Sequence, residues 1–289
     1  MTLRSLAPTG ALALALLGGS LAGCDSASDE PAALRLDVAA TVGANAFQAG
    51  QPFTVNGVTG ELDIAQAYLS GITLLHEDGR EIRLMADSPI TVRAKDENDV
   101  ELQHTIDERV VFANFAAGPS VTSVGEVPAG RYTGLRFLLG VEGLDNRIAP
   151  EDAPAGHALA PQDPTMHWNW NAGYVFLRLD GLLDIDGDGA VDASTGTPRD
   201  PASGQWRLHS GGATNAITVT LDEAFELDGG TMQDLRLSVD LAAFVDGLDL
   251  GDASKRWCMT GGCQDVVDMA KGNASDAFSL VGVRASTSM

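Results

Sequence analysis

The sequence predicts an all-β protein, an antiparallel β-sandwich of Greek-key or immunoglobulin-like type with long loops and at most short helices. Three observations lead to this fold class. Short runs with alternating apolar residues recur along the chain, as in strands that bury one face. Turn signals separate these runs, and the chain contains 33 glycines and 12 prolines. Long helical periodicity is scarce, which favours sheets over helical layers.

The N-terminus has the form of a lipoprotein export signal. Arg4 gives it a positive start, and an apolar run of Ala and Leu follows. The run ends at Leu21-Ala22-Gly23-Cys24, which has the form of a bacterial lipobox, where the Cys24 thiol receives the lipid. We therefore expect a signal peptide over residues 1–23 and a lipidated Cys24 with a flexible tether over residues 24–32. The mature protein would be held in the cell envelope, in the periplasm or on the outer-membrane surface, with a membrane as partner through its lipid anchor.

One β-sandwich domain is expected over residues 33–289, a length that can bury a core. The alternating run Leu34–Val38 begins it. Ile72–Leu75 and Glu81–Leu84 flank the turn Glu77–Arg80, a pattern that predicts a β-hairpin. Further strands are expected at Val110–Phe115, Gly130–Leu139, Tyr174–Gly181, Ala216–Leu221 and Leu235–Leu241.

Two short stretches have a helical pattern, Ser238–Phe244 and Gln264–Ala270. The Pro-rich stretch Ala149–Pro164 is too long for a simple turn. We expect it to be an ordered functional loop or a cover over the end of a sheet.

The composition is strongly acidic, with 40 Asp and Glu against 18 Lys and Arg and a net charge of −22. This field repels nucleic acid and anionic lipid head groups, so no nucleic-acid partner is expected. Cationic ligands or a basic partner would be attracted. A solubility adaptation is the alternative explanation of this acidity.

Three cysteines are present, and Cys24 belongs to the anchor. Cys258 and Cys263 remain, an even pair in an oxidising compartment. They predict a structural disulfide. A cysteine-based metal site is the alternative.

The most distinctive chemistry lies in Met166-His167-Trp168-Asn169-Trp170. If this segment is a strand, Met166, Trp168 and Trp170 share one face, where the two indoles would stack, and His167 and Asn169 share the other. Aromatic core packing is the alternative. Imidazole and thioether donors suit copper better than calcium or magnesium.

The chain has five histidines, none with the spacing of an HExxH zinc hydrolase. His209, in a Gly-rich segment, is the first candidate for a metal ligand. His76 at a hairpin tip and His167 beside Trp168 follow, and His157 comes fourth.

A second candidate site is an acidic loop. Asp184, Asp186 and Asp188 stand at alternate positions, Gly189 follows the third and Asp192 comes next, a pattern that resembles the start of a calcium loop. The twelfth position holds Thr in place of the expected Glu. The loop is either a partial calcium site or a solvated acidic turn.

Two segments resemble the MbnP-like family. Pro128–Val141 is similar to a strand of that family, and Asp163–Leu179 is similar to its motif of two Trp placed one residue apart before Gly-Tyr. Trp257–Cys263 resembles the Cys-Met element of the "metallo-mystery pair" members, and Leu208–Gly212 resembles a further element with His and Gly. The likeness covers most of residues 33–283, in order.

The resemblance implies copper binding through histidines together with a kynurenine, which a dihaem cytochrome c peroxidase-like (MbnH-type) partner makes by oxidising a Trp. By position, the resemblance makes Trp168 and Trp170 the candidates for the oxidised residue and His209 a candidate ligand. The sequence departs from the family at Asn146-Arg147, where members often have Asn-His.

The leading expectation is therefore a copper-binding lipoprotein without enzymatic activity, the macromolecular substrate of a dihaem oxidase. One alternative is a structural or adhesive β-sandwich lipoprotein, stabilised by calcium. Another is a carbohydrate-binding module that uses Trp168 and Trp170 as a stacking platform. A hydrolase has little support, since the chain has no GxSxG elbow and both domain cysteines are expected to be paired.

Overall fold

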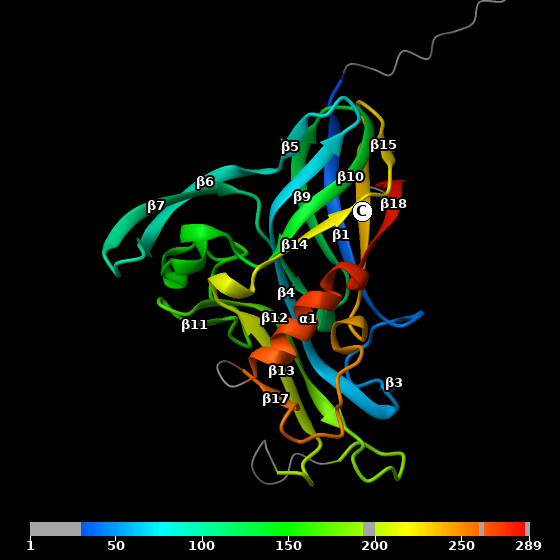
Figure 1. The fold of residues 1–289 in the computed structure, drawn as a ribbon. Coiled ribbons are helices and arrows are strands. Elements are labelled where there is room, and N and C mark those ends of the chain that lie inside the picture. Colours follow the sequence, from blue (N-terminus) through cyan, green and yellow to red (C-terminus); the bar gives the residue numbers. More distant parts are fainter. Residues whose placement is uncertain (1–29, 193–199, 260–262, 287–289) are drawn as a thin grey trace, which may run out of the picture.

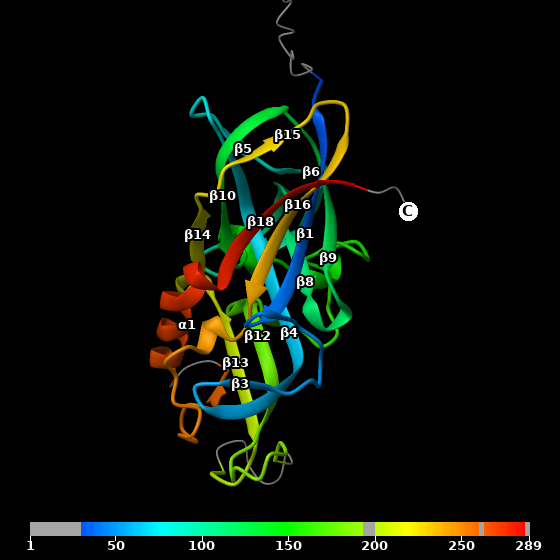
Figure 2. The ribbon, with the colours of Figure 1, turned by 90° about the vertical axis from the view of Figure 1, so that its right-hand side faces the viewer.

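The computed structural model describes residues 30–192, 200–259 and 263–286. The signal peptide and the lipidation of Cys24, expected within residues 1–29, lie outside the described residues. Two β-sheets pack face to face, and one α-helix lies against them in the described part of the chain (Figures 1 and 2). The predicted all-β sandwich is confirmed.

The larger sheet is built around β4, a strand of 19 residues that pairs with β10 along its second half and with β12 along its first half. Its strand order is β14-β10-β4-β12-β13-β17, with short strands added at β4, β10 and β12. The strands of the main path are β4 (Val58–His76), β10 (Gly130–Leu139), β12 (Gly173–Leu183), β13 (Gln205–Gly211), β14 (Ile217–Leu221) and β17 (Trp257–Cys258). The added strands are β3 (Phe53–Val55), β5 (Glu81–Arg83), β8 (Val111–Asn114), β11 (His167–Asn169) and β15 (Phe225–Leu227).

The smaller sheet has the order β18-β16-β1-β2, and β9 also pairs with β1. Its strands are β1 (Ala32–Val42), β2 (Asn45–Ala46), β9 (Ser120–Val127), β16 (Met232–Asp240) and β18 (Phe278–Ala285). β1 and β16 run parallel, as do β13 and β17, whereas the other described pairs are antiparallel. Both sheets therefore contain parallel and antiparallel pairs, the smaller one because β1 lies parallel to β16.

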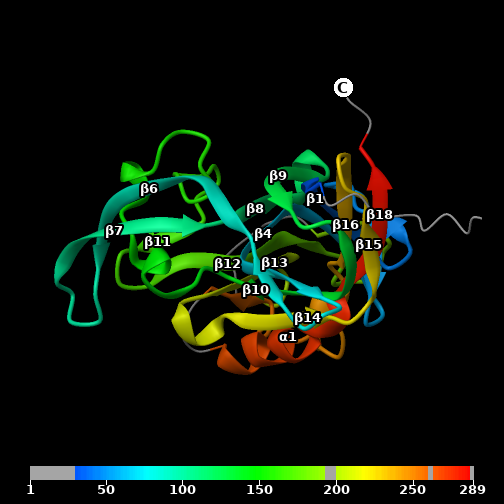
Figure 3. The same cartoon turned by 90° about the horizontal axis from the view of Figure 1, so that it is seen from above.

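A separate hairpin of β6 (Met85–Lys95) and β7 (Glu101–Glu108) extends to one side of the sandwich, as the view from above shows (Figure 3). Short 3-10 turns connect the strands: η1 (Phe115–Ala117), η2 (Gly143–Arg147), η3 (Pro150–Asp152), η4 (Ala213–Asn215) and η5 (Ala243–Val245).

The main core fills the space between the two sheets. Alternate residues of β1 and β16, such as Leu36 and Leu237, face alternate residues of β4 and β10, such as Leu74 and Leu135. A second core lies between the larger sheet, the β6–β7 hairpin and the Pro-rich stretch, with Tyr68, Tyr174 and Leu159 among its members. The stretch at residues 149–164 therefore covers a face of the larger sheet, whereas a cover over the end of a sheet was expected.

The helix α1 (Gln264–Ala277) confirms one expected helical stretch and extends it by two turns. Its apolar side, including Val267 and Ala270, packs into the main core. The prediction for Ser238–Phe244 was wrong: the strand β16 continues to Asp240, and a 3-10 turn follows. Pairing with β1 and β18 on both sides overrides the local helical pattern there.

The predicted hairpin of Ile72–Leu75 with Glu81–Leu84 is present as β4 and β5. The predicted disulfide between Cys258 and Cys263 is also present, and it joins β17 to the start of α1. Within the described ranges, no helix combines the length and apolar character needed to cross a membrane.

Candidate functional site

His209 stands at the centre of a buried polar cluster on the face of β12 and β13 that points away from the main core. It is only 4% exposed, and its Nε2 lies 2.5 Å from Oδ1 of Asp180. Arg178 holds the other oxygen of that carboxylate through Nε and Nη2, at 3.0 and 2.8 Å. The cluster arises because Arg178 and Asp180 are two residues apart on β12, and His209 pairs with Arg178 across the strands.

The electrostatics of the cluster fix the charge of Asp180. Burial alone would raise the pKa of its carboxyl, but the hydrogen bonds from His209 and Arg178 outweigh burial and hold the pKa below its usual range. The carboxylate is therefore ionised at neutral pH and accepts a hydrogen bond from the protonated Nε2 of His209. The remaining ring nitrogen of His209, Nδ1, is then the one that can act as a lone-pair donor, as in the carboxylate–histidine pairs that orient metal ligands.

The Trp motif passes over the same face. Nη1 of Arg178 donates a hydrogen bond to the carbonyl of Thr165 at 2.9 Å, which ties the segment before β11 to the sheet. The ring of Trp168 then lies over Gly211, where a β-carbon would come within 2.8 Å of Cζ3 and 2.9 Å of Cη2. Gly211 and His209 are two residues, roughly 7 Å, apart on β13, so the Trp168 ring lies on the same face of the strand as the His209 imidazole.

Trp170 lies elsewhere. The strand β11 ends at Asn169, and Trp170 belongs to the turn that leads into β12. Its ring lies beneath two cations of β6, with Cζ of Arg93 at 5.4 Å and Nζ of Lys95 at 5.1 Å from the ring centroid. The predicted stacking of Trp168 on Trp170 was wrong, because the alternation of side chains stops where the strand ends. The two indoles contact different elements, β6 for Trp170 and β13 for Trp168, in the part of the chain that the structure describes.

His167 points to the other side of β11 from Trp168. Its ring packs edge-on against Tyr174, with centroids 4.8 Å apart, and its Nε2 is buried without a hydrogen-bond partner among the described residues. Burial lowers the pKa of this imidazole below its ordinary value, so it is neutral at pH 7. A small surface cavity of about 320 Å³ lies beside it, lined by Pro150, Glu151, Pro161, Thr165, His167, Asn169 and Trp170.

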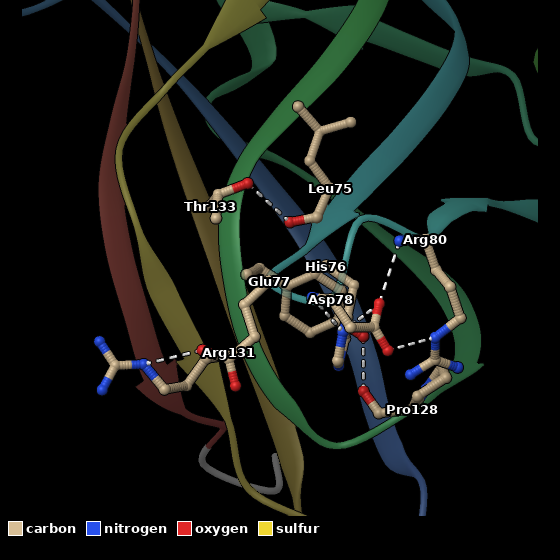
Figure 4. A network of polar contacts seen from close by, with 9 residues as sticks. Leu75, His76, Glu77, Asp78, Arg80, Pro128, Arg131 and Thr133 are labelled. Carbon is tan, nitrogen blue, oxygen red and sulfur yellow. Dashed lines mark hydrogen bonds and ion pairs between the residues drawn. The ribbon is translucent and has the colours of Figure 1, made fainter.

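His76 is not part of this cluster. It ends β4, ten residues beyond Gln66, which pairs with Arg178, so it lies roughly 30 Å away along the strand. Figure 4 shows it in a turn network: its Nδ1 accepts a hydrogen bond from the Asp78 backbone at 3.3 Å, and Asp78 also binds Arg80 at 2.6 Å. The same view shows Thr133 donating to the Leu75 carbonyl, which pins β10 to β4. These bonds give His76 a role in holding the turn.

The acidic loop is also separate from the cluster. Side-chain oxygens of Asp184, Asp186 and Asp188 lie within 4.8 Å of one another. The same carboxylates cap their own loop, since Asp184 accepts hydrogen bonds from two backbone N–H groups and Asp192 accepts one from Ile185 at 2.6 Å. Position twelve of the proposed calcium loop, Thr195, lies outside the described residues. The calcium site stays a prediction.

Three residues that position the cluster were not identified from the sequence. Asp180 and Arg178 are charged residues two apart in an otherwise apolar strand, a signal of a polar cluster on one face. In the sequence, Asn146 stands out only as the neighbour of Arg147. It is buried, its Oδ1 accepts the Tyr174 N–H at 2.8 Å, and it packs on Gly173, so it fixes the turn between Trp170 and β12.

Comparison with known proteins gives a family. No curated protein sequence matches this chain significantly. The solved structure of MbnP from Methylosinus trichosporium is similar, with 19% identity and a TM-score of 0.47 over 88% of this chain and 98% of that one. The sequence profile of the MbnP family matches residues 31–260, most of the chain. The protein described here therefore belongs to the MbnP family.

Proposed function

We propose that this protein is a copper-binding lipoprotein of the bacterial cell envelope without enzymatic activity, and that a dihaem peroxidase-like partner oxidises one of its tryptophans to kynurenine. Its membership of the MbnP family supports the copper assignment through the family resemblance of the double-Trp motif. The acidic surface, with a net charge of −22, would attract a cationic metal or a basic partner.

One observation carries the proposal: the pairing of His209 with Asp180 on the face that Trp168 covers. A carboxylate that accepts the Nε2 proton fixes the tautomer and orientation of the ring and raises the basicity of Nδ1. Opening the indole ring would add an aromatic amine and a ketone close to this imidazole. The donor set so formed, nitrogen with one oxygen, suits copper.

The residues of the cluster would divide the work. His209 would bind the metal through Nδ1, and Asp180 would hold the imidazole. Arg178 would keep Asp180 ionised and fasten the Trp segment through the Thr165 carbonyl. The affinity of this site for copper would depend on its imidazole and amine nitrogens.

Co-production tests the proposal. The protein would be made with and without a dihaem partner, its peptide spanning residues 163–178 would be examined by mass spectrometry, and its copper content would be measured. We expect kynurenine in this peptide only with the partner, and copper retention only in the oxidised protein. Intact tryptophans and no retained copper in either sample would contradict the proposal.

Two matched variants locate the ligand. His209→Gln should lose copper but still be oxidised by the partner, because it leaves the Trp motif in place. His76→Gln removes a histidine roughly 30 Å from the cluster and should retain copper. Equal copper retention by both variants, with both folded by circular dichroism, would exclude His209 as a ligand.

A further inference from the structure

We propose that Lys95, with Arg93 beside it, directs oxidation to Trp168 by protecting Trp170. This inference rests on the proposed oxidation of the Trp motif, and it assigns the oxidised residue and the residue that determines the choice. Nothing in the spacing of the motif separates the two tryptophans, since both precede Gly-Tyr within a few residues. The difference lies in the groups that each ring contacts.

Trp170 lies within contact of two positive charges. Lys95 and Arg93 are two residues apart on β6, so both side chains lie on one face of the hairpin, and both reach the Trp170 ring. A cation over an indole face is attracted by the electron density of the ring. One-electron oxidation turns this attraction into repulsion, because the ring then carries a positive charge of its own. The contact therefore makes Trp170 harder to oxidise.

Lys95 contributes the larger share of the protection. Arg93 is surrounded by carboxylates, with Asp152 at 2.7 Å, Glu151 at 3.3 Å and Glu101 at 3.9 Å, and these largely balance its charge. Lys95 takes part in no ion pair within the part of the chain that the structure describes. Its ammonium group is the less compensated charge at the ring.

Trp168 has the opposite surroundings. The chain has four tryptophans, all among the described residues. Trp206 is fully buried, and Trp257 has the Arg207 guanidinium 4.4 Å from its ring centroid. Of the four, Trp168 alone is neither fully buried nor covered by a cation within the described structure.

The position of the Trp168 ring on β13 also suits ring opening. The atoms held against Gly211 are Cζ3 and Cη2 of the six-membered ring. The bond that must break, between Cγ and Cδ1, lies in the five-membered ring at the opposite edge. The aniline ring of the product can therefore keep its contact with Gly211 while the five-membered ring opens.

The oxidation balances with peroxide as the oxidant that the haem partner uses. Two molecules of hydrogen peroxide each accept two electrons from the indole and each deliver one oxygen atom. The Cγ–Cδ1 bond breaks to give N-formylkynurenine, and two molecules of water leave. Addition of one water then cleaves the formyl group, giving kynurenine and formic acid.

Chemical one-electron oxidants test the inference without the partner. The full-length protein would be oxidised with a cationic ruthenium(III) polypyridyl complex and, separately, with an anionic iridium(IV) halide. The ratio of oxygenated Trp168 to oxygenated Trp170 would be measured by tandem mass spectrometry. We expect oxidation mainly at Trp168, and Lys95→Gln should raise the share of Trp170 on the order of tenfold.

Two controls distinguish an effect of the Lys95 charge on the Trp170 ring from a structural effect of the substitution and from electrostatic steering of the oxidant. Lys95→Arg keeps the cation and should keep the wild-type ratio. The two oxidants carry opposite charges, so an effect that only steers their collision would change sign between them, and this outcome would overturn the inference. An unchanged ratio in Lys95→Gln would overturn it as well.

The partner then distinguishes the two proposals. If the dihaem protein oxidises Trp170 in the wild type, the assignment of Trp168 fails and the proposed function stands. If the partner oxidises neither residue while the chemical oxidants select Trp168, the proposed function fails and the protective role of Lys95 stands.

Discussion

Gly211 shows how one residue positions the Trp motif. A β-carbon at this position would lie 2.4 Å from the Tyr174 carbonyl oxygen and 2.8 Å from Cζ3 of Trp168. Only glycine leaves room for the outer edge of the six-membered ring of Trp168 to approach β13. The absence of a side chain thus sets the distance between the Trp168 ring and the sheet that carries His209.

Gly211→Ala should therefore displace Trp168 and destabilise the protein by about 1–3 kcal/mol, the usual cost of overpacking. Urea denaturation would measure the free energy of unfolding, and Trp fluorescence would report the ring. Gly272→Ala is the matched control: no atom lies within 4 Å of the added methyl group in α1, and it should stabilise by about 1 kcal/mol. Equal effects of the two substitutions would contradict this account of Gly211.

Glu108 is a buried acid that lies close to both a positively charged and a negatively charged side chain, Arg83 and Asp145. Its carboxylate contacts Nη2 of Arg83 at 2.5 Å and the Gly71 N–H at 3.1 Å. Burial, with the nearby charge of Asp145, raises its pKa from 4.5 to about 7 in spite of Arg83. Asp145 in turn contacts Nε2 of His104 at 2.5 Å. These contacts hold η2, and with it Asn146, against the β6–β7 hairpin.

Since the folded protein holds the Glu108 proton more tightly than the unfolded chain does, this group stabilises the fold fully below pH 4.5. The contribution is lost as the pH rises through about 7. We expect a loss of about 1–3 kcal/mol across this window, absent in Glu108→Gln. Glu142→Gln, which removes an exposed partner of Arg83, should keep the wild-type pH profile. Urea denaturation at several pH values would decide, and parallel profiles for all three proteins would contradict the assignment.

At the scale of elements, the short strand β11 depends on few contacts, whereas the helix α1 combines core packing with a disulfide. β11 has three residues and pairs only with β12 among the described strands. Arg178 fastens the segment before β11 through Thr165, and Asn146 fixes the start of β12 after it. The disulfide of Cys258 with Cys263 ties the start of α1 to β17, which pairs with β13 beside the His209 cluster.

Replacing both cysteines, as in Cys258→Ser with Cys263→Ser, should lower the free energy of unfolding by about 2 kcal/mol, because the unfolded chain gains freedom. Guanidinium denaturation would measure the loss. The wild-type protein with its disulfide reduced should show the same midpoint as the double variant. A midpoint unchanged by either treatment would show that packing of α1 alone holds this edge.

At the scale of the whole molecule, the sandwich supports a buried polar cluster on the face of the larger sheet that points away from the main core. The main core between the sheets holds β12 and β13 in register, and the hairpin and the Pro-rich stretch cover the second core beside them. The first described residue, Glu30, lies close to the start of β1, so an anchor at Cys24 would leave the folded part a few residues from the membrane.

Cys24→Ser tests the proposed anchor. The variant should leave the membrane fraction and appear as soluble protein, since the lipid has no thiol to which it can be attached. Fractionation with antibody detection would measure this, and mass spectrometry of the wild-type N-terminus would identify the lipid. Wild-type protein found only in the soluble fraction would contradict the lipoprotein assignment.

Much of the fold could be predicted because strands and turns have recognisable local patterns in the sequence. The range Gly130–Leu139 coincides with β10, and the hairpin of β4 and β5 follows the turn residues between them. The parallel pairing of β1 with β16 could not be predicted, since it joins segments about 200 residues apart. The helical pattern at Ser238–Phe244 misled for the same reason: neighbouring strands far away in sequence decided its state.

The sequence by itself determined the fold class, the disulfide and the double-Trp motif, because periodicity, cysteine number and motif spacing are local properties. Only the tertiary structure decided which of these residues meet. His209 contacts Asp180, 29 residues away in the sequence, and Trp170 contacts Lys95 although the elements from β7 to β11 lie between them in the chain. Such pairs depend on strand register and on where a strand ends, and both are set by packing between distant segments. For this reason the two tryptophans, equivalent in the sequence, have different surroundings in the folded protein.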